Sequence, residues 1–338
     1  MLQYTLYDQN DRLKKLSKLH DILEQMNKLV DWGIFLPILT KALPHIDNGK
    51  GGRPPVSRLL IFKILIIKRL YNLSYDQTEY QINDRLTFMR FLGLDFGSPV
   101  PDAKTIWKYE ELLSKGGYGK ELFDMFFAEI DKNGYVTRAG SIVDASFIEA
   151  PRRKNTKEQR ESLKSGKTPE EWDDPGHPQK LMQRDTDATW TKKGNTAYFG
   201  YKDNVKVDAE SKLIVNYAVT TASASDIKGA ETLFDVKDKV AYGDSAYPSL
   251  TLPADVENMI SEKGARNNPL TDEQLENNQT KSKVRCRVEH VFAGIVQMVG
   301  GTSIRCKNIM RANFSISMMN LIYNIRRVIS INKKNEAA

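Results

Sequence analysis

The sequence predicts an α/β protein in which a helical N-terminal part precedes a mixed sheet flanked by helices. Helical periodicity with several start and stop signals runs from Leu2 to about Lys132, which is typical of an all-α unit. From Gly140 the pattern becomes strand, hairpin, helix, strand and helix, an order that favours a mixed sheet covered by helices. We therefore expect a helical domain at 1–135 and a sheet domain at 136–338.

Three signals define helices in the N-terminal part. An apolar run predicts one helix over Val56 to Leu70, and Ser74 followed by Gln77 forms a capping-box pattern at the start of the next. Asp102 is placed to cap a further helix that ends at the glycine pair 116–117. Short helices separated by tight turns resemble the helix-turn-helix class of DNA reader, and a plain helical bundle is the alternative.

The sheet begins with an apolar run at 140–148 that contains one carboxylate, Asp144. Residues 151–196 are rich in charge, Gly and Pro, which predicts a mobile, solvated insertion. Strand patterns at 197–207 and 213–220, joined by a short polar turn, predict a hairpin.

The remaining elements are short except at the C-terminus. Residues 226–234 favour a helix, and 239–242 favour a short buried strand that ends at Gly243 and Asp244. After a polar stretch, helices are expected over 281–299 and 309–331.

Composition excludes several classes of protein. The chain has 338 residues, 28% charged and 40% hydrophobic, which is typical of a soluble globular protein. Its apolar runs stop far short of the ~20 residues of a membrane span, and the first twenty residues lack signal-peptide features. We expect a cytoplasmic protein without a membrane partner. Two cysteines and four scattered histidines indicate neither disulfides nor zinc, so any metal would need oxygen ligands.

Basic charge is concentrated near the C-terminus. Residues 277–338 contain eleven Lys or Arg and two Glu, whereas the net charge of the whole chain is +7. Such a segment is typical of a protein that binds a polyanion, most often nucleic acid. A solvated basic tail is the alternative.

Two aspartates stand where strands end. Asp144 and Asp244 each lie at or near the end of an apolar strand, where an ionised carboxylate is costly unless it reaches solvent, a cation or a donor. If the strands are parallel neighbours, both carboxylates lie at the carboxyl edge of the sheet. Two close anions repel, so a divalent cation is their natural partner. For each Asp alone, a turn-forming role is the alternative.

A third acid lies on the helix predicted after 281. Its apolar stripe includes Val288 and Val291, and Glu289 falls at the edge of that stripe with Arg285 one turn before it. The helix can thus bury its valines while it directs Glu289 toward the two Asp. The alternative is a surface ion pair between Arg285 and Glu289. Three carboxylates beside a basic surface are the parts that two-metal phosphoryl transfer needs.

The sequence around these acids resembles the DDE transposases of bacterial insertion sequences, in particular the insertion-sequence-five group. The resemblance covers nearly the whole chain and rests on the following segments: GRPP from Gly52, IVDASFIEAPR from Ile142, GYKDNVKVD from Gly200, TTASASDIKGAE from Thr220, AYGDSAY from Ala241, KGARNNPLT from Lys263 and RCRVEHVFAGI from Arg285.

The resemblance implies a fold, a site and an activity. It implies a ribonuclease H-like sheet domain with Asp144, Asp244 and Glu289 as the catalytic, metal-binding acids for two Mg²⁺ ions, for which Mn²⁺ would substitute. It implies a transposase that binds terminal inverted repeats, cleaves the 3′ strands and joins the ends to target DNA. Two DNA ends must be processed together, so a homodimer or larger assembly on DNA is expected.

One family signature is incomplete. Related transposases carry a tyrosine, arginine, glutamate and lysine around the third acid; Arg285 and Glu289 fit, but Ser282 and Val296 stand at the other two positions. By charge and proximity, Lys281, Lys283 or Arg287 could take the place of the missing lysine as a phosphate contact. Further expected DNA contacts are Arg285 itself, Lys202, Arg266, Arg305 and Lys307.

Trp190 lies in a polar setting and could stack on an unpaired base, with burial against the sheet as the alternative. Two rival functions remain open from the sequence. One is a ribonuclease H-like nuclease without strand transfer, and the other is a DNA-binding regulator whose metal site is idle.

Overall fold

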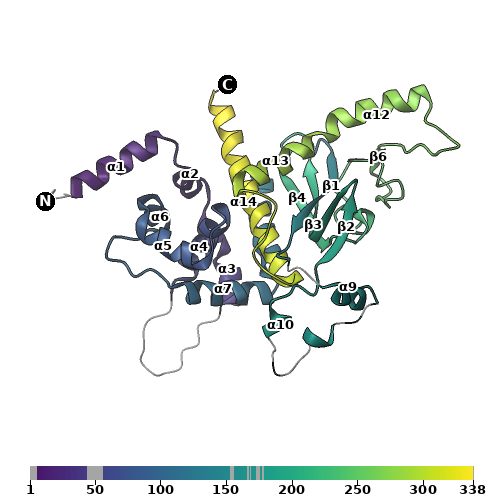
Figure 1. Ribbon diagram of the computed structural model, residues 1–338. Coiled ribbons are helices and arrows are strands. Elements are labelled where there is room, and N and C mark those ends of the chain that lie inside the picture. Colours follow the sequence, from purple (N-terminus) through teal and green to yellow (C-terminus); the bar gives the residue numbers. More distant parts are fainter. Residues whose placement is uncertain are drawn as a thin grey trace.

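The computed structural model describes residues 6–43, 56–152, 156–165, 167, 169–172, 176 and 179–337. The Gly52 to Pro55 segment quoted above lies outside these residues. Figure 1 shows a helical part on one side, a sheet on the other and the long C-terminal helix α14 (Ile309–Ala337) between them. None of the helices in the described ranges is long and apolar enough to cross a membrane.

The N-terminal part is helical, as predicted. Its elements are α1 (Leu6–Lys18), α2 (Ile22–Leu29), η1 (Trp32–Phe35), α3 (Leu36–Ala42), α4 (Arg58–Leu70), α5 (Tyr75–Asp84), α6 (Leu86–Leu92), α7 (Ala103–Lys115) and α8 (Tyr118–Lys132). Ser74 and Gln77 form the predicted capping box at the start of α5, and Asp102 accepts a hydrogen bond from the Thr105 N–H at the start of α7.

The sheet is mixed and has six strands. They are β1 (Ser141–Glu149), β2 (Thr189–Lys193), β3 (Thr196–Asp208), β4 (Ile214–Thr221), β5 (Val240–Gly243) and β6 (Glu257–Ile260). Their order is β2-β3-β1-β5-β6, with β4 also paired to β3. The β1–β3, β2–β3 and β3–β4 pairs are antiparallel, and the β1–β5 and β5–β6 pairs are parallel. This arrangement confirms the predicted ribonuclease H-like mixed sheet flanked by helices.

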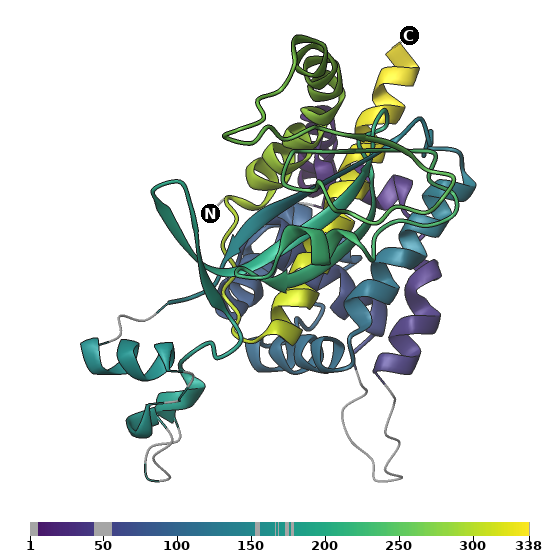
Figure 2. The same ribbon diagram turned by 90° about the vertical axis from the view of Figure 1, so that its right-hand side faces the viewer.

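Several elements differ from the prediction. The predicted insertion at 151–196 contains α9 (Lys157–Lys164), η2 (Glu170–Trp172), α10 (Gln179–Met182) and strand β2, and Figure 2 shows the β2–β3 hairpin reaching past the rest of the sheet. The helix α11 (Asp226–Ala230) is shorter than predicted. Strand β6 has no signal in the sequence, because its four residues, ENMI, have no alternating pattern.

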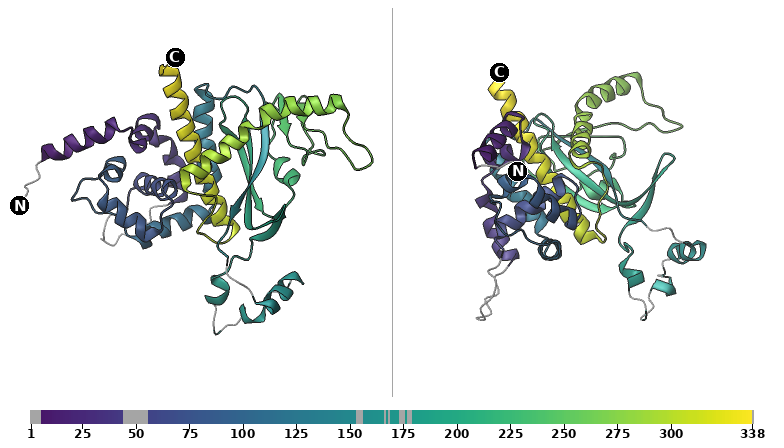
Figure 3. Two further views of the ribbon diagram at one scale, coloured as in Figure 1. Left: turned by 45° about the horizontal axis from the view of Figure 1, so that its top comes forward. Right: turned by 60° about the vertical axis from the view of Figure 1, so that its left-hand side comes forward.

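The helix predicted over 281–299 is two helices. The first, α12 (Asp272–Arg285), buries no side chain and so lacks the apolar periodicity that would reveal it. Its capping box of Thr271 and Gln274 is the local signal that marks its start. The chain bends at Cys286, and α13 (Arg287–Val299) follows. Figure 3 shows these two helices running across one end of the sheet.

The helix α14 joins the two halves of the core. It packs on α4, α7 and α8 of the helical part and on β4 and α13 of the sheet part, so its apolar residues occupy more than one face. Two buried amides on it serve the sheet. Asn324 bonds both the N–H and the carbonyl of Ile214 at 2.9 and 2.8 Å, which caps backbone groups of the edge strand β4. Asn320 donates to Asp203 of β3 at 3.1 Å.

Candidate active site

Strands β1 and β5 bring Asp144 and Asp244 to one edge of the sheet. Their parallel register pairs Ser141 with Ala241 and Ile142 with Tyr242. Two residues further along each strand, the same register places Asp144 level with Asp244. The predicted parallel pairing is therefore present, and the charge on Asp244 contributes to raising the Asp144 pKa, as expected for carboxylates within electrostatic reach.

The ionised form of the Asp144 carboxyl is disfavoured by its surroundings. Its pKa is raised to about 6, chiefly because burial disfavours the charged form and also because Asp244 repels it. A hydrogen bond from the Ala145 N–H at 2.8 Å and the nearby Arg285 charge act in the opposite direction. The pair of aspartates thus carries more negative charge than its surroundings neutralise, and a bound cation would relieve it.

Asp244 also shapes the turn that follows β5. Its Oδ1 accepts a hydrogen bond from the Ala246 N–H at 2.7 Å, a contact typical of a turn-forming aspartate. The side chain remains partly exposed. The turn-forming role and the position beside Asp144 are therefore both present, and the turn fixes the carboxylate at the sheet edge.

Arg285 links the first and third acids. It is the last residue of α12, and its Nη1 lies 3.9 Å from Asp144 Oδ2 while its Nη2 lies 3.5 Å from Glu289 Oε1. Val288 and Val291 are buried beneath α13, whereas the Glu289 side chain is 63% exposed. The surface ion pair foreseen for Arg285 and Glu289 is present, but the same guanidinium also faces Asp144, which helical spacing alone did not reveal.

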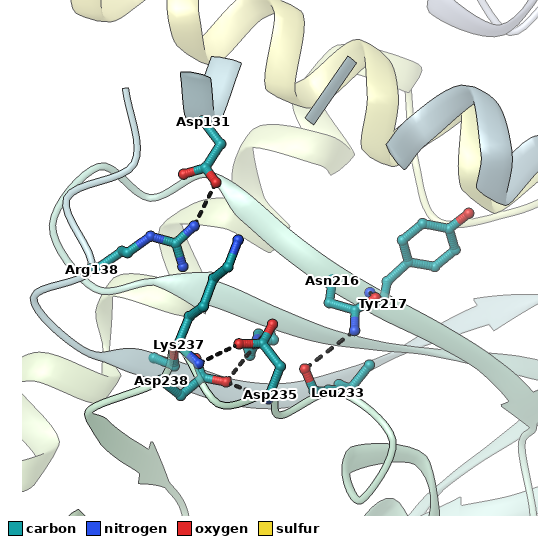
Figure 4. Close-up of polar contacts among 10 residues, drawn as sticks. Asp131, Arg138, Asn216, Tyr217, Leu233, Asp235, Lys237 and Asp238 are labelled. Atoms are coloured by element: carbon teal, nitrogen blue, oxygen red, sulfur yellow. Dashed lines mark hydrogen bonds and ion pairs between the residues drawn. The ribbon is translucent and has the colours of Figure 1, made fainter. Parts of the chain in front are cut away.

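Several other acids near the sheet are paired with basic side chains. Figure 4 shows Asp235 and Asp238 in a tight turn and Arg138 facing Asp131, with an Arg138 Nη2 to Asp131 Oδ2 distance of 2.5 Å. The buried Lys206 ammonium lies 2.7 Å from Asp238 Oδ2. The 3.9 Å distance from Arg285 to Asp144 is longer than the distances in these pairs. Within the described residues, Asp144 and Asp244 therefore differ from these acids in lacking a close basic partner.

The donor set suits a hard divalent cation. Two carboxylates with unrelieved repulsion provide the oxygen ligands that Mg²⁺ and Mn²⁺ prefer. In the ranges that the structure describes, no three His, Cys, Asp or Glu side chains are close enough together to hold a metal ion. The Glu289 carboxylate is exposed and paired with Arg285, and the structure does not bring it together with the two aspartates as a three-carboxylate group.

Lys202 corrects one expectation. This residue, predicted to face DNA, is 7% exposed, and its ammonium donates to the Ala224 carbonyl and to Asp226 Oδ1, each at 2.7 Å. The Lys202 ammonium is buried and fully engaged in these contacts because both faces of β3 are covered. Lys202 is a structural residue, and its partner Asp226 follows the ASAS segment as the first residue of α11.

The other predicted DNA contacts divide into engaged and free side chains. Lys281 donates to the Ile260 carbonyl at 3.0 Å and Arg287 to the Ala209 carbonyl at 2.8 Å, so both help to anchor their helices. Lys283 and Arg266 are exposed. Arg305 and Lys307 follow α13, and they donate to the Asn72 carbonyl at 3.3 Å and to the Met182 carbonyl at 2.8 Å.

Trp190 stands on the projecting hairpin. Its side chain is 53% exposed, its ring centroid lies 5.1 Å from that of Phe199, and the Arg152 guanidinium lies 5.9 Å from the ring. The tryptophan is therefore not buried against the sheet. Its exposed face leaves room for stacking by another planar group.

The chain matches two described families. A family described as "Transposase domain (DUF772)" matches residues 11–112, and one described as "Transposase DDE domain" matches residues 137–325. Among solved structures, the chain is similar to "Cryo-EM structure of piggyBac transposase synaptic complex with hairpin DNA (SNHP)", with 10% identity, a TM-score of 0.43 and coverage of 93% of this chain and 74% of that one. It is also similar to "Crystal structure of the Mos1 Strand Transfer Complex", with 13% identity, a TM-score of 0.21 and coverage of 88% and 84%.

Proposed function

This chain belongs to the transposase DDE domain family, and on that premise we propose that it binds the terminal inverted repeats of its own element, cleaves their 3′ strands and joins them to target DNA. The observation that carries the proposal is the register of β1 and β5, which sets Asp144 level with Asp244. Arg285 connects that pair to Glu289.

Asp144, Asp244 and Glu289 would hold the divalent cations. Bound there, two Mg²⁺ or Mn²⁺ ions supply activation of a water molecule or a 3′-hydroxyl and stabilisation of the leaving oxygen in an in-line displacement. The rigid sheet fixes the two aspartates, and α13 carries the glutamate on a helix anchored by Val288 and Val291. Arg285 lies between Asp144 and Glu289 and partly neutralises both carboxylates before a cation binds.

The parts of the chain divide the work in this proposal. The helical domain at 1–135 recognises the DNA ends, and the domain at 136–338 performs the chemistry, with the exposed Lys283 and Arg266 on phosphates. Two ends must be cut and joined together, so the active species is a homodimer or larger assembly on double-stranded DNA. The place of action is the bacterial cytoplasm, on the nucleoid.

The test uses a DNA fragment that carries the inverted ends flanking this gene, incubated with Mg²⁺ or Mn²⁺. We expect metal-dependent nicks at the end boundary with the wild-type protein and none with Glu289→Gln, while both proteins bind the DNA equally. Glu273→Gln is the matched control because it makes the same change at an exposed acid on α12.

Strand transfer is measured next with a supercoiled target plasmid. Joined products support the transposase reaction, and nicking without joining would support a hydrolytic nuclease instead. If wild type and Glu289→Gln bind the ends but cut equally or not at all, the three-acid mechanism is wrong and a DNA-binding regulator becomes the better description.

A further inference from the structure

A cavity of about 340 Å³ lies where the helical part meets the start of α14. Its walls come from the end of α4, the turn after it, α7, residues 305–307 and the first turns of α14. None of its lining residues belongs to β1, β5 or α13, so it is separate from the three acids. The volume lies within the range of small-molecule sites, which begins at about 300 Å³.

Arg69 is the unusual residue in this cavity. It is only 9% exposed, and its Nε and Nη2 atoms are buried without a hydrogen-bond partner among the described residues. Burial lowers its pKa to about 10, so the guanidinium stays charged at neutral pH. A buried cation with unused donors is costly, which points to an anionic acceptor that is supplied from outside the chain.

The cavity as a whole carries excess positive charge. Its lining includes Lys68, Arg69, Arg305, Lys307 and Arg311 but only one acid, Glu110. Lys68 pairs with Glu110 at 2.9 Å, and Arg311 forms a two-point contact with Glu111 at 2.6 and 2.8 Å. Within the described part of the chain, Arg69, Arg305 and Lys307 form no ion pair with a carboxylate. No carboxylate contact therefore neutralises these three cations, although Arg305 and Lys307 each donate to one backbone carbonyl.

The remaining walls are suited to a planar, partly apolar group. Trp107 on α7 lines the cavity and is 48% exposed, although a tryptophan of this size is normally buried. Leu73, Phe314 and Met318 add apolar surface. An exposed indole beside unpaired cations is the combination that binds a base by stacking and its phosphate by charge.

We propose that this cavity binds a nucleoside phosphate, with the phosphate on Arg69 and Arg305 and the base against Trp107. The nucleotide is either part of a DNA strand or a free mononucleotide, and the first source rests on the transposase function proposed above. Because Arg305 belongs to the loop that Ile304 fastens to the Glu149 carbonyl at the end of β1, the cavity adjoins the sheet domain from the helical side.

The test is calorimetric titration of the full chain, without divalent metal, with deoxyadenosine 5′-monophosphate, deoxyadenosine and inorganic phosphate. We expect the monophosphate to bind at least tenfold more tightly than either fragment. Arg69→Met should weaken its binding at least tenfold, and Trp107→Ala should weaken the monophosphate about tenfold while leaving inorganic phosphate unchanged. Lys108→Gln, which removes an exposed charge from α7 outside the cavity, should change neither.

Arg69→Met is nearly isosteric, and its melting temperature reports whether it folds. If it does not, Arg305→Gln carries the test, because Arg305 is exposed and its loss should weaken the monophosphate without unfolding the chain. Absence of monophosphate binding, or equal binding by these variants and wild type, would overturn the proposal. The proposal would also be overturned if wild type bound the monophosphate and inorganic phosphate with equal affinity and Trp107→Ala bound the monophosphate as tightly as wild type.

Competition identifies the source of the nucleotide. Displacement of the monophosphate by an oligonucleotide assigns the cavity to DNA, and absence of displacement assigns it to a free mononucleotide. The titration contains no metal and requires no cleavage, so it is independent of the nicking assay. Monophosphate binding by a protein that never nicks its ends would refute the proposed function and leave the cavity assignment in place.

Discussion

The Arg285 guanidinium lies 3.9 Å from the Asp144 carboxylate. Burial and the neighbouring Asp244 both raise the pKa of Asp144, and Arg285 partly opposes them. The arginine therefore tempers the negative charge of the aspartate pair. It also competes electrostatically with any divalent cation that approaches the pair.

Replacement of Arg285 should tighten metal binding. A unit charge a few ångströms from the site contributes about 1 kcal/mol of repulsion, so Arg285→Gln should lower the dissociation constant for Mn²⁺ about fivefold. Electron paramagnetic resonance titration of Mn²⁺ without DNA measures the change. Arg287→Gln is the matched control, because Arg287 bonds the Ala209 carbonyl instead of facing the acids. Weaker or equal Mn²⁺ binding by Arg285→Gln would contradict the role given to this residue.

Removal of the Asp144 charge should stabilise the metal-free protein. The pKa of Asp144 is about 6 in the fold against 3.8 for the free group, so the native state binds its proton more tightly than the unfolded state. Stability then falls as pH rises from about 4 to about 6 and stays level above that range. Asp144→Asn should raise the unfolding free energy by about 2 to 3 kcal/mol at pH 8 and leave it unchanged at pH 3.

Urea denaturation in EDTA across this pH range measures the effect, and Asp144→Asn should be inactive in the nicking assay throughout. If Asp144→Asn is less stable than wild type at pH 8, or if its gain in unfolding free energy persists at pH 3, the fold does not disfavour the Asp144 charge.

The sequence was enough to predict that Asp144 and Asp244 lie side by side, because a general rule of parallel sheets determines their positions. Parallel neighbours end at the same sheet edge, and two short apolar strands that each finish in Asp could be aligned by that rule alone. The approach of Arg285 to Asp144 follows from no such rule, because it depends on where α12 lies against the sheet. α12 buries no side chain, so its sequence has no apolar periodicity that would indicate this.

Strand β3 shows why its polar residues suggested exposed side chains, as in the expected DNA contact of Lys202. Every residue from Tyr201 to Ala209 is buried, although charged and apolar residues alternate from Val205 to Ala209 in a way typical of a half-exposed strand. The strand is central, with α14 on one face and α11 on the other, so its charged side chains find partners from distant segments. Asp226, Asp235 and Asp238 come from beyond the hairpin, and nothing local announces them.

Loss of Lys202 should affect stability and leave DNA binding intact. The buried ammonium bonds Asp226 and the Ala224 carbonyl, so Lys202→Met removes both contacts and should cost about 2 to 3 kcal/mol of unfolding free energy. Affinity of the folded variant for the DNA ends should equal that of wild type, measured by fluorescence anisotropy at a temperature where it is fully folded.

Lys283→Gln provides the opposite pattern for comparison. Lys283 is exposed, so its replacement should change stability by less than about 0.5 kcal/mol and reduce the salt dependence of DNA binding by about one ion. Reduced DNA affinity in folded Lys202→Met, with no loss of stability, would restore the rejected role of Lys202.

A buried acid on the same strand offers a test of how the core handles charge. Asp203 is 1% exposed, and burial raises its pKa to about 7, opposed by a hydrogen bond from Asn320 Nδ2. The Asn320 Oδ1 atom has no donor among the described residues. Asp203→Asn would supply that donor and complete a reciprocal amide pair, whereas the ionised Asp203 cannot.

The native state holds the Asp203 proton more tightly than the unfolded state, so this residue lowers stability as pH rises from about 4 to about 7. Asp203→Asn should therefore gain about 2 to 4 kcal/mol of unfolding free energy at pH 8 and nothing at pH 3. Asp203→Ala should lose stability at pH 3, because it leaves a cavity and both polar atoms of the Asn320 amide unpaired. Thermal and urea unfolding of the three proteins at both pH values decide between these outcomes. If Asp203→Asn is less stable than wild type at pH 8, the Asp203 carboxylate has a charged partner, and burial does not determine its pKa.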